Sequence, residues 1–318
     1  NGDDGGNVAL RSLQTVFASM EAASTQNDQG ILGRPVSTLP LCRNLGISVY
    51  EQQDSQEFWK LLLPELHLPS LVDLYQGAYE GYIAALDGSG RQRKRQETFL
   101  DLSLDIAESS SVLESMEKMF CEPEILSEKE GNNGWRPEKG ADKVDALKGS
   151  SLYASGLPSI LQLHLMRFRY EWQTDTMSKI NDKFSFPKEL NLSSICTDVS
   201  KDEIQHTIFD LQSIVVHKGR YGSGHYYSYV RPDIQKNKWF RFDDDRIRRV
   251  TFKEVKADAF GGLNVNKTKD QKKKSNFWAR LIRGEGRNNY GWGGRDSSAY
   301  MLQYVRRTDI PKLFTHKS

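Results

Sequence analysis

Alternating hydrophobic and polar positions in the last third of the chain predict a hairpin. Aromatic residues alternate with polar ones from His225 to Val230, and a second aromatic run extends from Trp239 to Phe242. A period of two residues is typical of a strand, and Pro232 between the runs predicts the turn. Residues equidistant from the turn face each other in an antiparallel pair. We therefore expect His225 and Asp243 to meet.

A helical period lies near the start of the chain. Its hydrophobic positions, spaced three, four and three residues apart, are Leu10, Leu13, Phe17 and Met20. This spacing places them on one face of an amphipathic helix, so that we expect this face to be buried.

The segment Q-D-S-Q-E-F predicts a second helix. Asp54 stands three residues before Glu57, as in a capping box, and Pro64 is expected to end or bend the helix. The residues expected to face the core are Phe58, Leu61 and Leu62.

Strands are predicted in the middle of the chain, with a basic turn between the first two. They are expected at Gly77 to Ile83, at Leu100 to Ile106 and, half-buried, at Ile160 to Phe168. The basic run from Arg91 to Arg95 is predicted to be a loop, with a targeting or nucleic-acid patch as the alternative. A short helix is expected at Val112 to Phe120.

Composition indicates an ordinary globular protein. The chain has 318 residues, of which 37% are hydrophobic and 27% charged. No window reaches the roughly 18 consecutive apolar residues of a membrane span. The net charge of +2 gives no strong electrostatic argument for nucleic acid. We expect neither a membrane nor nucleic acid as a partner.

Three widely separated cysteines, Cys42, Cys121 and Cys196, favour a reducing compartment over a disulfide framework. An intracellular location is therefore expected, in the cytoplasm, the nucleus or both. The sequence has no C-x-x-C pair, so we predict no structural zinc and no cofactor.

A histidine oriented by a carboxylate is the general-base half of a nucleophilic triad. His225 follows a glycine-rich loop, and three aspartates follow Phe242. One alternative is an ordinary histidine beside a solvated turn. Another is a metal hydrolase built on His217, His225 and the aspartates. His164 is interpreted as a residue on the face of a strand.

These residues carry a resemblance to a family. G-x-G-H-Y-x-x-Y-V followed by W-x-x-F-D-D-D resembles the histidine box of the ubiquitin-specific proteases, papain-like cysteine proteases that cut after the C-terminal glycine of ubiquitin. The resemblance implies that His225 is the general base and that Asp243 orients it, with Asp244 as the less favoured substitute.

Two further segments extend the resemblance. Q-D-S-Q-E-F resembles the family's glutamine box, which implies that Asp54 contacts the arginine-rich tail of ubiquitin and that Gln56 lies along the same groove. L-x-L-x-L-M-R-F implies that Met166 and Phe168 line the channel for this tail, with Tyr226 closing over it. Helix capping and plain strand packing are the respective alternatives.

The resemblance implies an α+β, papain-like fold of the ubiquitin-specific protease type, with palm and fingers and most of the helical thumb missing. Residues 1–306 are expected to form a partial domain, with the fingers near 75–150 and a loop insertion at 264–294. The tail is 307–318. The closing strand, Ser298 to Arg306, resembles that of the herpesvirus-associated branch.

The cysteine box of the family is expected before Leu10, and no cysteine of this sequence matches it by motif. A base without a thiolate performs no acyl transfer. Retention of His225, Asp243 and Asp54 favours a fragment of an active deubiquitinase whose nucleophile lies upstream, inactive on its own. The alternative is a non-catalytic scaffold that binds ubiquitin. Either way, the expected partners are ubiquitin and ubiquitinated proteins.

Overall fold

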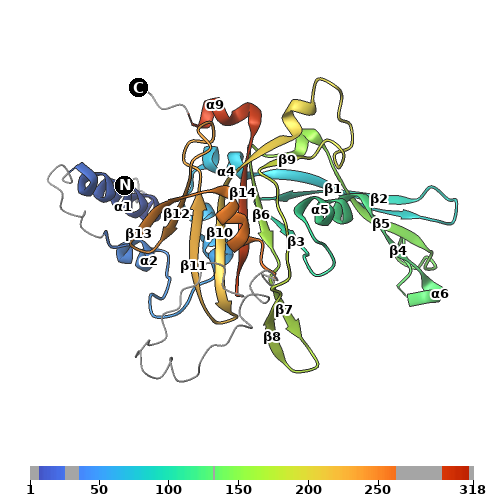
Figure 1. Cartoon of the computed structure of the whole chain (residues 1–318). Coiled ribbons are helices and arrows are strands. Elements are labelled where there is room, and N and C mark those ends of the chain that lie inside the picture. The colour runs from blue at the N-terminus through green and yellow to red at the C-terminus, as the bar shows by residue number, and fades with distance from the viewer. Residues whose placement is uncertain (1–6, 26–35, 132, 263–295, 315–318) are drawn as a thin grey trace, which may run out of the picture. The chain divides into compact units, whose positions relative to one another are not determined.

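A computed structural model gives the fold of the chain (Figure 1). The residues that it describes are 7–25, 36–131, 133–262 and 296–314. They fall into two compact units, Asn1–Leu74 and Tyr75–Ser318. The predicted insertion at 264–294 lies outside the described residues. Within the described part, no helix is both long and apolar enough to cross a membrane.

The first unit is helical. Its helices are α1 (Val8–Thr25), α2 (Leu39–Asn44), α3 (Ser55–Glu65) and α4 (Pro69–Tyr75), the last of which ends in the second unit. Both helices predicted in this region are confirmed. The small core of this unit consists of Ala9, Leu41 and Leu45, with Leu13, Val16, Ile47, Phe58 and Leu62 packed against it.

The packed face of α1 differs from the predicted one. Leu13 packs as expected, but its partners on the helix are Ala9 and Val16. Phe17 and Met20 are 60% and 52% exposed. The packed stripe of α1 is thus rotated from the predicted one, toward Ala9 and Val16.

In α3 the prediction is right at the start of the helix and wrong at one core position. Asp54 is the N-cap, and Pro64 lies within the last turn. Leu63 is buried, whereas Leu61 is exposed.

The second unit is built on an eight-stranded sheet. Its strands are β3 (Leu102–Leu104), β6 (Ile160–Leu165), β9 (Glu189–Asn191), β10 (Ile208–Arg220), β11 (Ser223–Val230), β12 (Trp239–Asp243), β13 (Arg246–Val250) and β14 (Ser297–Arg306). The order is β13-β12-β11-β10-β14-β6-β3, and β9 pairs with β10. Only the β3–β6 pair among these described strands is parallel.

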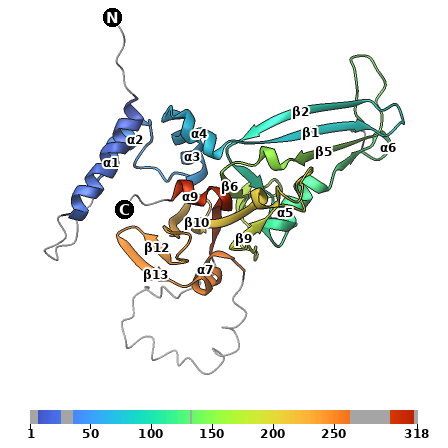
Figure 2. The same cartoon turned by 90° about the horizontal axis from the view of Figure 1, so that it is seen from above.

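A four-stranded sheet, β2-β1-β5-β4, extends from the same unit as long ribbons (Figure 2). Its strands are β1 (Gly77–Ala85), β2 (Gln92–Phe99), β4 (Glu124–Leu126) and β5 (Ala146–Leu152). The loop predicted from Arg91 to Arg95 is wrong, because most of this run lies in β2. β2 is an edge strand with both faces in solvent, so that it carries charge where a buried strand would show hydrophobic alternation.

Shorter elements complete the second unit. They are α5 (Val112–Cys121), α6 (Glu128–Gly131), β7 (Phe168–Glu171), β8 (Thr176–Lys179), α7 (Phe252–Ala259), α9 (Ile310–Leu313) and the 3₁₀ turns Ala154–Gly156, Ile204–Thr207 and Arg307–Asp309. The helix predicted at Val112 is confirmed. In the segment predicted as a tail, Ile310 packs with Ile234 and Val305 in a cluster of their own.

The main core surrounds β6, which is buried on both faces. The prediction of a half-buried strand is therefore wrong: Leu161, Leu163 and Leu165 are buried on one face, and Gln162 and His164 on the other. His164 is a strand residue, as expected, and its Nδ1 lies 3.1 Å from Ser103 Oγ. Tertiary packing on both sides of a central strand overrides the alternation that the sequence shows.

Candidate active site

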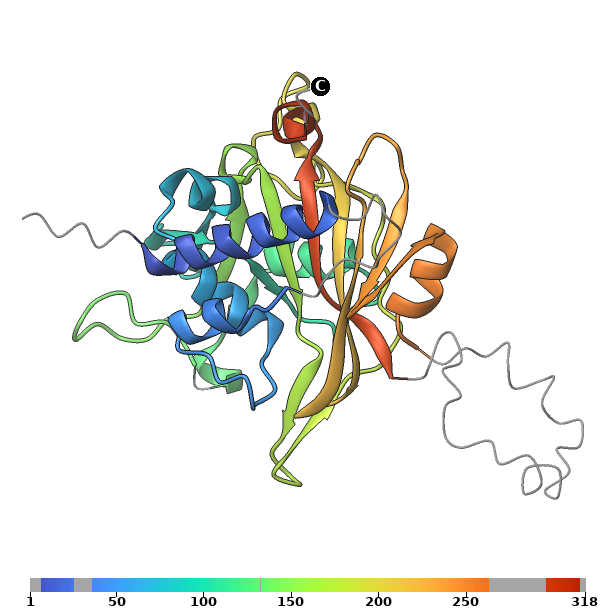
Figure 3. The same ribbon diagram turned by 90° about the vertical axis from the view of Figure 1, so that its left-hand side faces the viewer.

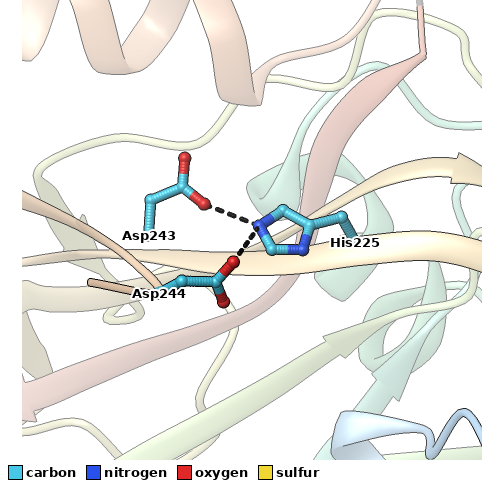
Figure 4. A group of neighbouring side chains, drawn as sticks. All are labelled: His225, Asp243 and Asp244. Atoms are coloured by element: carbon cyan, nitrogen blue, oxygen red, sulfur yellow. Dashed lines mark hydrogen bonds and ion pairs between the residues drawn. The ribbon is translucent and has the colours of Figure 1, made fainter. Parts of the chain in front are cut away.

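The predicted hairpin is confirmed and brings a histidine to a carboxylate. β11 pairs antiparallel with β12, with Ser228 opposite Phe242. Continued by one residue, this register places Asp243 opposite Tyr227, so that His225, two residues earlier on the same face of β11, is a diagonal neighbour of Asp243. The ring Nε2 of His225 is 2.6 Å from Asp243 Oδ1 (Figure 4). Their side chains are 43% and 24% exposed, so that the pair remains accessible from solvent.

Asp244 has a lesser contact with the same ring. Its Oδ2 lies 3.9 Å from His225 Nε2, and its side chain is 77% exposed. Asp244 begins the two-residue turn between β12 and β13, where its φ of 51° is one that aspartate tolerates. Asp243 is therefore the nearer of the two carboxylates to the ring, and the catalytic roles of both stay a prediction.

The hydrogen bond also defines which ring nitrogen is free. A carboxylate accepts hydrogen bonds, so Nε2 carries the hydrogen in the neutral ring. Nδ1 of His225 points away from both carboxylates (Figure 4). The pair can therefore present an unprotonated Nδ1 to a proton donor.

Helix α7 is tied to the same hairpin through Asp258. The hydroxyls of Tyr227 and Tyr229 donate to Asp258 Oδ2, and Ser297 Oγ donates to its Oδ1 at 2.8 Å. Burial, followed by the Asp258 carboxylate, raises the pKa of both tyrosines, so that they remain hydroxyl donors. Figure 3 shows α7 beside the strands of the large sheet.

The opposite face of the hairpin carries an aromatic cluster. Tyr226 and Phe168, two of the predicted channel residues, lie 4.8 Å and 5.2 Å from the ring centroid of His217. Tyr300 lies 5.7 Å from each of the two. Met166, the third predicted residue, is exposed beside Phe168. Two of the three residues thus share one cluster.

Register excludes His217 from a metal site with His225. His217 pairs with Tyr226, whereas His225 pairs with Lys218 on the next position, so that the two imidazoles lie on opposite faces of the sheet. Gly224 is required beside them, because a Cβ at this position would overlap the His217 ring.

One group of described residues could offer ligands to an ion. One donor atom from each of His225, Asp243 and Asp244 lies within 4.8 Å of the others. The second oxygen of Asp243 lies 2.7 Å from Arg241 Nη2, so an ion would compete with a guanidinium as well as with the His225 hydrogen bond.

Asp54 and Gln56 belong to the first unit. Asp54 Oδ1 accepts hydrogen bonds from the backbone N–H of Gln56 at 2.8 Å and of Glu57 at 3.2 Å, which confirms the helix cap. Their contact with ubiquitin stays a prediction.

Two of the cysteines have environments that disfavour a thiolate. Burial raises the pKa of Cys196 to about 12. Burial, together with Glu117 and Glu122, raises the pKa of Cys121. A nucleophilic cysteine requires a lowered pKa.

Sequence reasoning missed Arg241 and Asp258. The signal was present for Arg241, because it stands two residues before Asp243 and therefore on the same face of β12. Asp258 gave no such signal, since it lies in a separate helix.

Known proteins resemble this chain along most of its length. The model of the family "ubiquitin carboxyl-terminal hydrolase" matches residues 2–304. Ubiquitin carboxyl-terminal hydrolase 15 of Schizosaccharomyces pombe is 29% identical over 98% of this chain and 26% of its own length. Ubiquitin carboxyl-terminal hydrolase 15 of Saccharomyces cerevisiae is 31% identical over 86% of this chain and 22% of its own length. The chain thus spans about a quarter of these relatives.

Solved structures share the fold. The SAGA DUB module of Ubp8, Sgf11, Sus1 and Sgf73 bound to monoubiquitin contains a chain with a TM-score of 0.66 and 23% identity, covering 95% of this chain and 59% of that one. The same module bound to ubiquitin aldehyde contains a chain with a TM-score of 0.61 and 24% identity, covering 85% of this chain and 53% of that one. The predicted α+β, papain-like fold is confirmed. The chain belongs to the ubiquitin carboxyl-terminal hydrolase family.

Proposed function

We propose that this chain supplies the general base of a thiol-dependent deubiquitinase, which hydrolyses the bond after the C-terminal glycine of ubiquitin. The observation that carries the proposal is the 2.6 Å contact between His225 Nε2 and Asp243 Oδ1, within a chain of this hydrolase family. A base that is oriented by a carboxylate and open to solvent suits proton transfer to and from a substrate.

The proposed reaction uses Nδ1 of His225. This nitrogen takes the proton of a cysteine thiol, and the thiolate attacks the carbonyl of the last glycine. The imidazolium then donates the proton to the departing lysine amine, which leaves a thioester. Water, deprotonated by the same nitrogen, hydrolyses the thioester and releases the thiol. Asp243 holds the Nε2–H tautomer and stabilises the imidazolium in each half of the reaction.

We assign the nucleophile to a cysteine outside the 318 residues. The support is chemical, because the pKa of Cys121 and Cys196 is raised. Cys42 lies in α2, in a sequence that does not resemble the family's cysteine box.

For the tail of ubiquitin we propose two sets of contacts, each within its own unit. In the first unit they are Asp54 and Gln56, and in the second unit they are Met166, Phe168 and Tyr226. The shared cluster of Phe168 and Tyr226 supports the assignment, as do related chains whose solved structures hold monoubiquitin or ubiquitin aldehyde. In this proposal, residues 1–306 form a partial ubiquitin-specific protease domain, nearest the herpesvirus-associated branch, with fingers near 75–150. The protein acts inside the cell on ubiquitinated proteins.

The test is release of a fluorophore from a ubiquitin C-terminal amide. It compares the chain as printed with a version extended through its native upstream sequence, each with and without His225→Ala. We expect release only from the extended protein, abolished by His225→Ala while ubiquitin binding persists. Full release by the extended His225→Ala variant contradicts the role of the base. Binding without release by either wild-type chain indicates a scaffold.

A further inference from the structure

We propose that Arg241 is a positioning residue for the catalytic pair: it fixes the Asp243 carboxylate and thereby the tautomer of His225. This inference rests on the proposed function for its kinetic consequence. The tautomer itself is a property of the chain that can be measured without turnover.

The Asp243 carboxylate is held at both oxygens. Oδ1 is 2.6 Å from His225 Nε2, and Oδ2 is 2.7 Å from Arg241 Nη2. The two partners come from different strands, His225 from β11 and Arg241 from β12. Rotation of the carboxylate would break both contacts at once, so that the arginine opposes the motion that would release the histidine.

Arg241 is itself held in place. Its guanidinium carbon lies 4.1 Å from the centroid of the Tyr227 ring, in cation–π contact. The Tyr227 hydroxyl donates to Asp258 of α7. The side chain of Arg241 is only 21% exposed. A continuous row of contacts therefore connects α7, through Tyr227 and Arg241, to Asp243.

Without the guanidinium, Asp243 has fewer constraints. Its neighbour Asp244 also reaches the histidine Nε2, at 3.9 Å. Repulsion between the two carboxylates would then push Asp243 away from the ring, since the ion pair with Arg241 no longer offsets it. Arg241 keeps Asp243 on the ring in the presence of this like charge.

The chain offers a matched control. Arg248 of β13 stands opposite Arg241 in the strand ladder, and its Nη1 lies 3.5 Å from Glu254 Oε1. Arg248→Ala removes the same charge from a neighbouring position of the sheet, where the arginine pairs with Glu254. It separates a specific contact from a general effect of positive charge.

The first experiment reads the His225 tautomer by ¹⁵N NMR of the imidazole nitrogens in the 318-residue chain. We expect a protonated Nε2 and a bare Nδ1 in the wild type and in Arg241→Lys, which retains an ammonium for one oxygen. In Arg241→Ala both nitrogens should move toward the averaged shifts of mixed tautomers. Arg248→Ala should leave them unchanged. If Arg241→Ala does not fold, Arg241→Gln, which keeps the length without the charge, replaces it.

The second experiment measures hydrolysis of the fluorogenic ubiquitin amide by the extended protein. Arg241→Ala should lower kcat about tenfold at nearly unchanged KM, the expected scale for loss of one charge-assisted contact. Arg241→Lys should recover most of this loss, and Arg248→Ala should stay within about twofold of the wild type.

An unchanged tautomer in Arg241→Ala, or in Arg241→Gln where that variant replaces it, overturns the proposal, and so does an equal effect of Arg248→Ala. Failure of the proposed function is seen separately, as full turnover by His225→Ala, and leaves the NMR test of Arg241 intact.

Discussion

Exchanging the two carboxylates beside His225 for amides should have very unequal effects on turnover. Asp243→Asn keeps the shape of the side chain but removes the charge that stabilises the imidazolium and favours the Nε2–H tautomer. Asp244→Asn changes a side chain that is 77% exposed and 3.9 Å from the ring. Only the first change disrupts a hydrogen bond.

The size of the effect follows from the geometry. A hydrogen bond to a charged group contributes about 1.5–3 kcal/mol, which corresponds to roughly 10–150-fold in rate. Asp243 is 24% exposed and Asp244 lies near enough to replace part of its charge, so we expect the lower half of this range. For Asp244→Asn alone, less than about threefold is expected, as for exposed ion pairs.

The assay is kcat for the fluorogenic ubiquitin amide, measured on the extended protein. The double variant should lose more activity than the product of the two single losses, because Asp244 compensates only once Asp243 has gone. An Asp244→Asn loss as large as that of Asp243→Asn would refute the assignment of Asp243 as the orienting carboxylate.

Three further predictions concern stability. Gly224→Ala should lower the free energy of unfolding in urea by about 1–3 kcal/mol, because the new Cβ overlaps the His217 ring; an unchanged midpoint would contradict this. Arg167→Leu should lower the free energy of unfolding by about 3 kcal/mol in the same assay, because the buried guanidinium donates hydrogen bonds to three backbone carbonyls. An unchanged free energy of unfolding would mean that these carbonyls need no donor. Burial lowers the pKa of Lys179 from 10.5 to about 8. The unfolded chain therefore binds more protons between these values, and the stability of the wild type relative to Lys179→Met should rise with pH across this window; a flat difference would contradict the shift.

The hairpin could be predicted from the sequence because its evidence is local. Alternation and a proline turn predict the hairpin and bring His225 near Asp243 without any knowledge of the rest of the fold, although the register makes the two residues diagonal neighbours and not directly opposite. The same holds for the helix at Asp54, whose cap is formed within three residues.

Features that depend on the surroundings of a strand could not be predicted in this way. β6 alternates like a surface strand but is buried on both faces. β2 carries a basic run that looks like a loop because an edge strand in solvent needs no hydrophobic face. Arg241 looks like a solvated residue until Tyr227 of the neighbouring strand is placed under it. For β6 the neighbours that decide its burial, β3 and β14, are remote in sequence. For β2 and Arg241 the neighbouring strand is close in sequence, but its register and exposure were not predicted.

The central claim is that His225 and Asp243 serve a cysteine outside the printed residues. The most direct measurement is covalent capture of the extended protein by ubiquitin with a C-terminal electrophile, followed by mapping of the modified cysteine by mass spectrometry. We predict one adduct, on a cysteine upstream of residue 1, that forms much more slowly in His225→Ala. An adduct on Cys42, Cys121 or Cys196, or an equal rate in His225→Ala, would contradict the account.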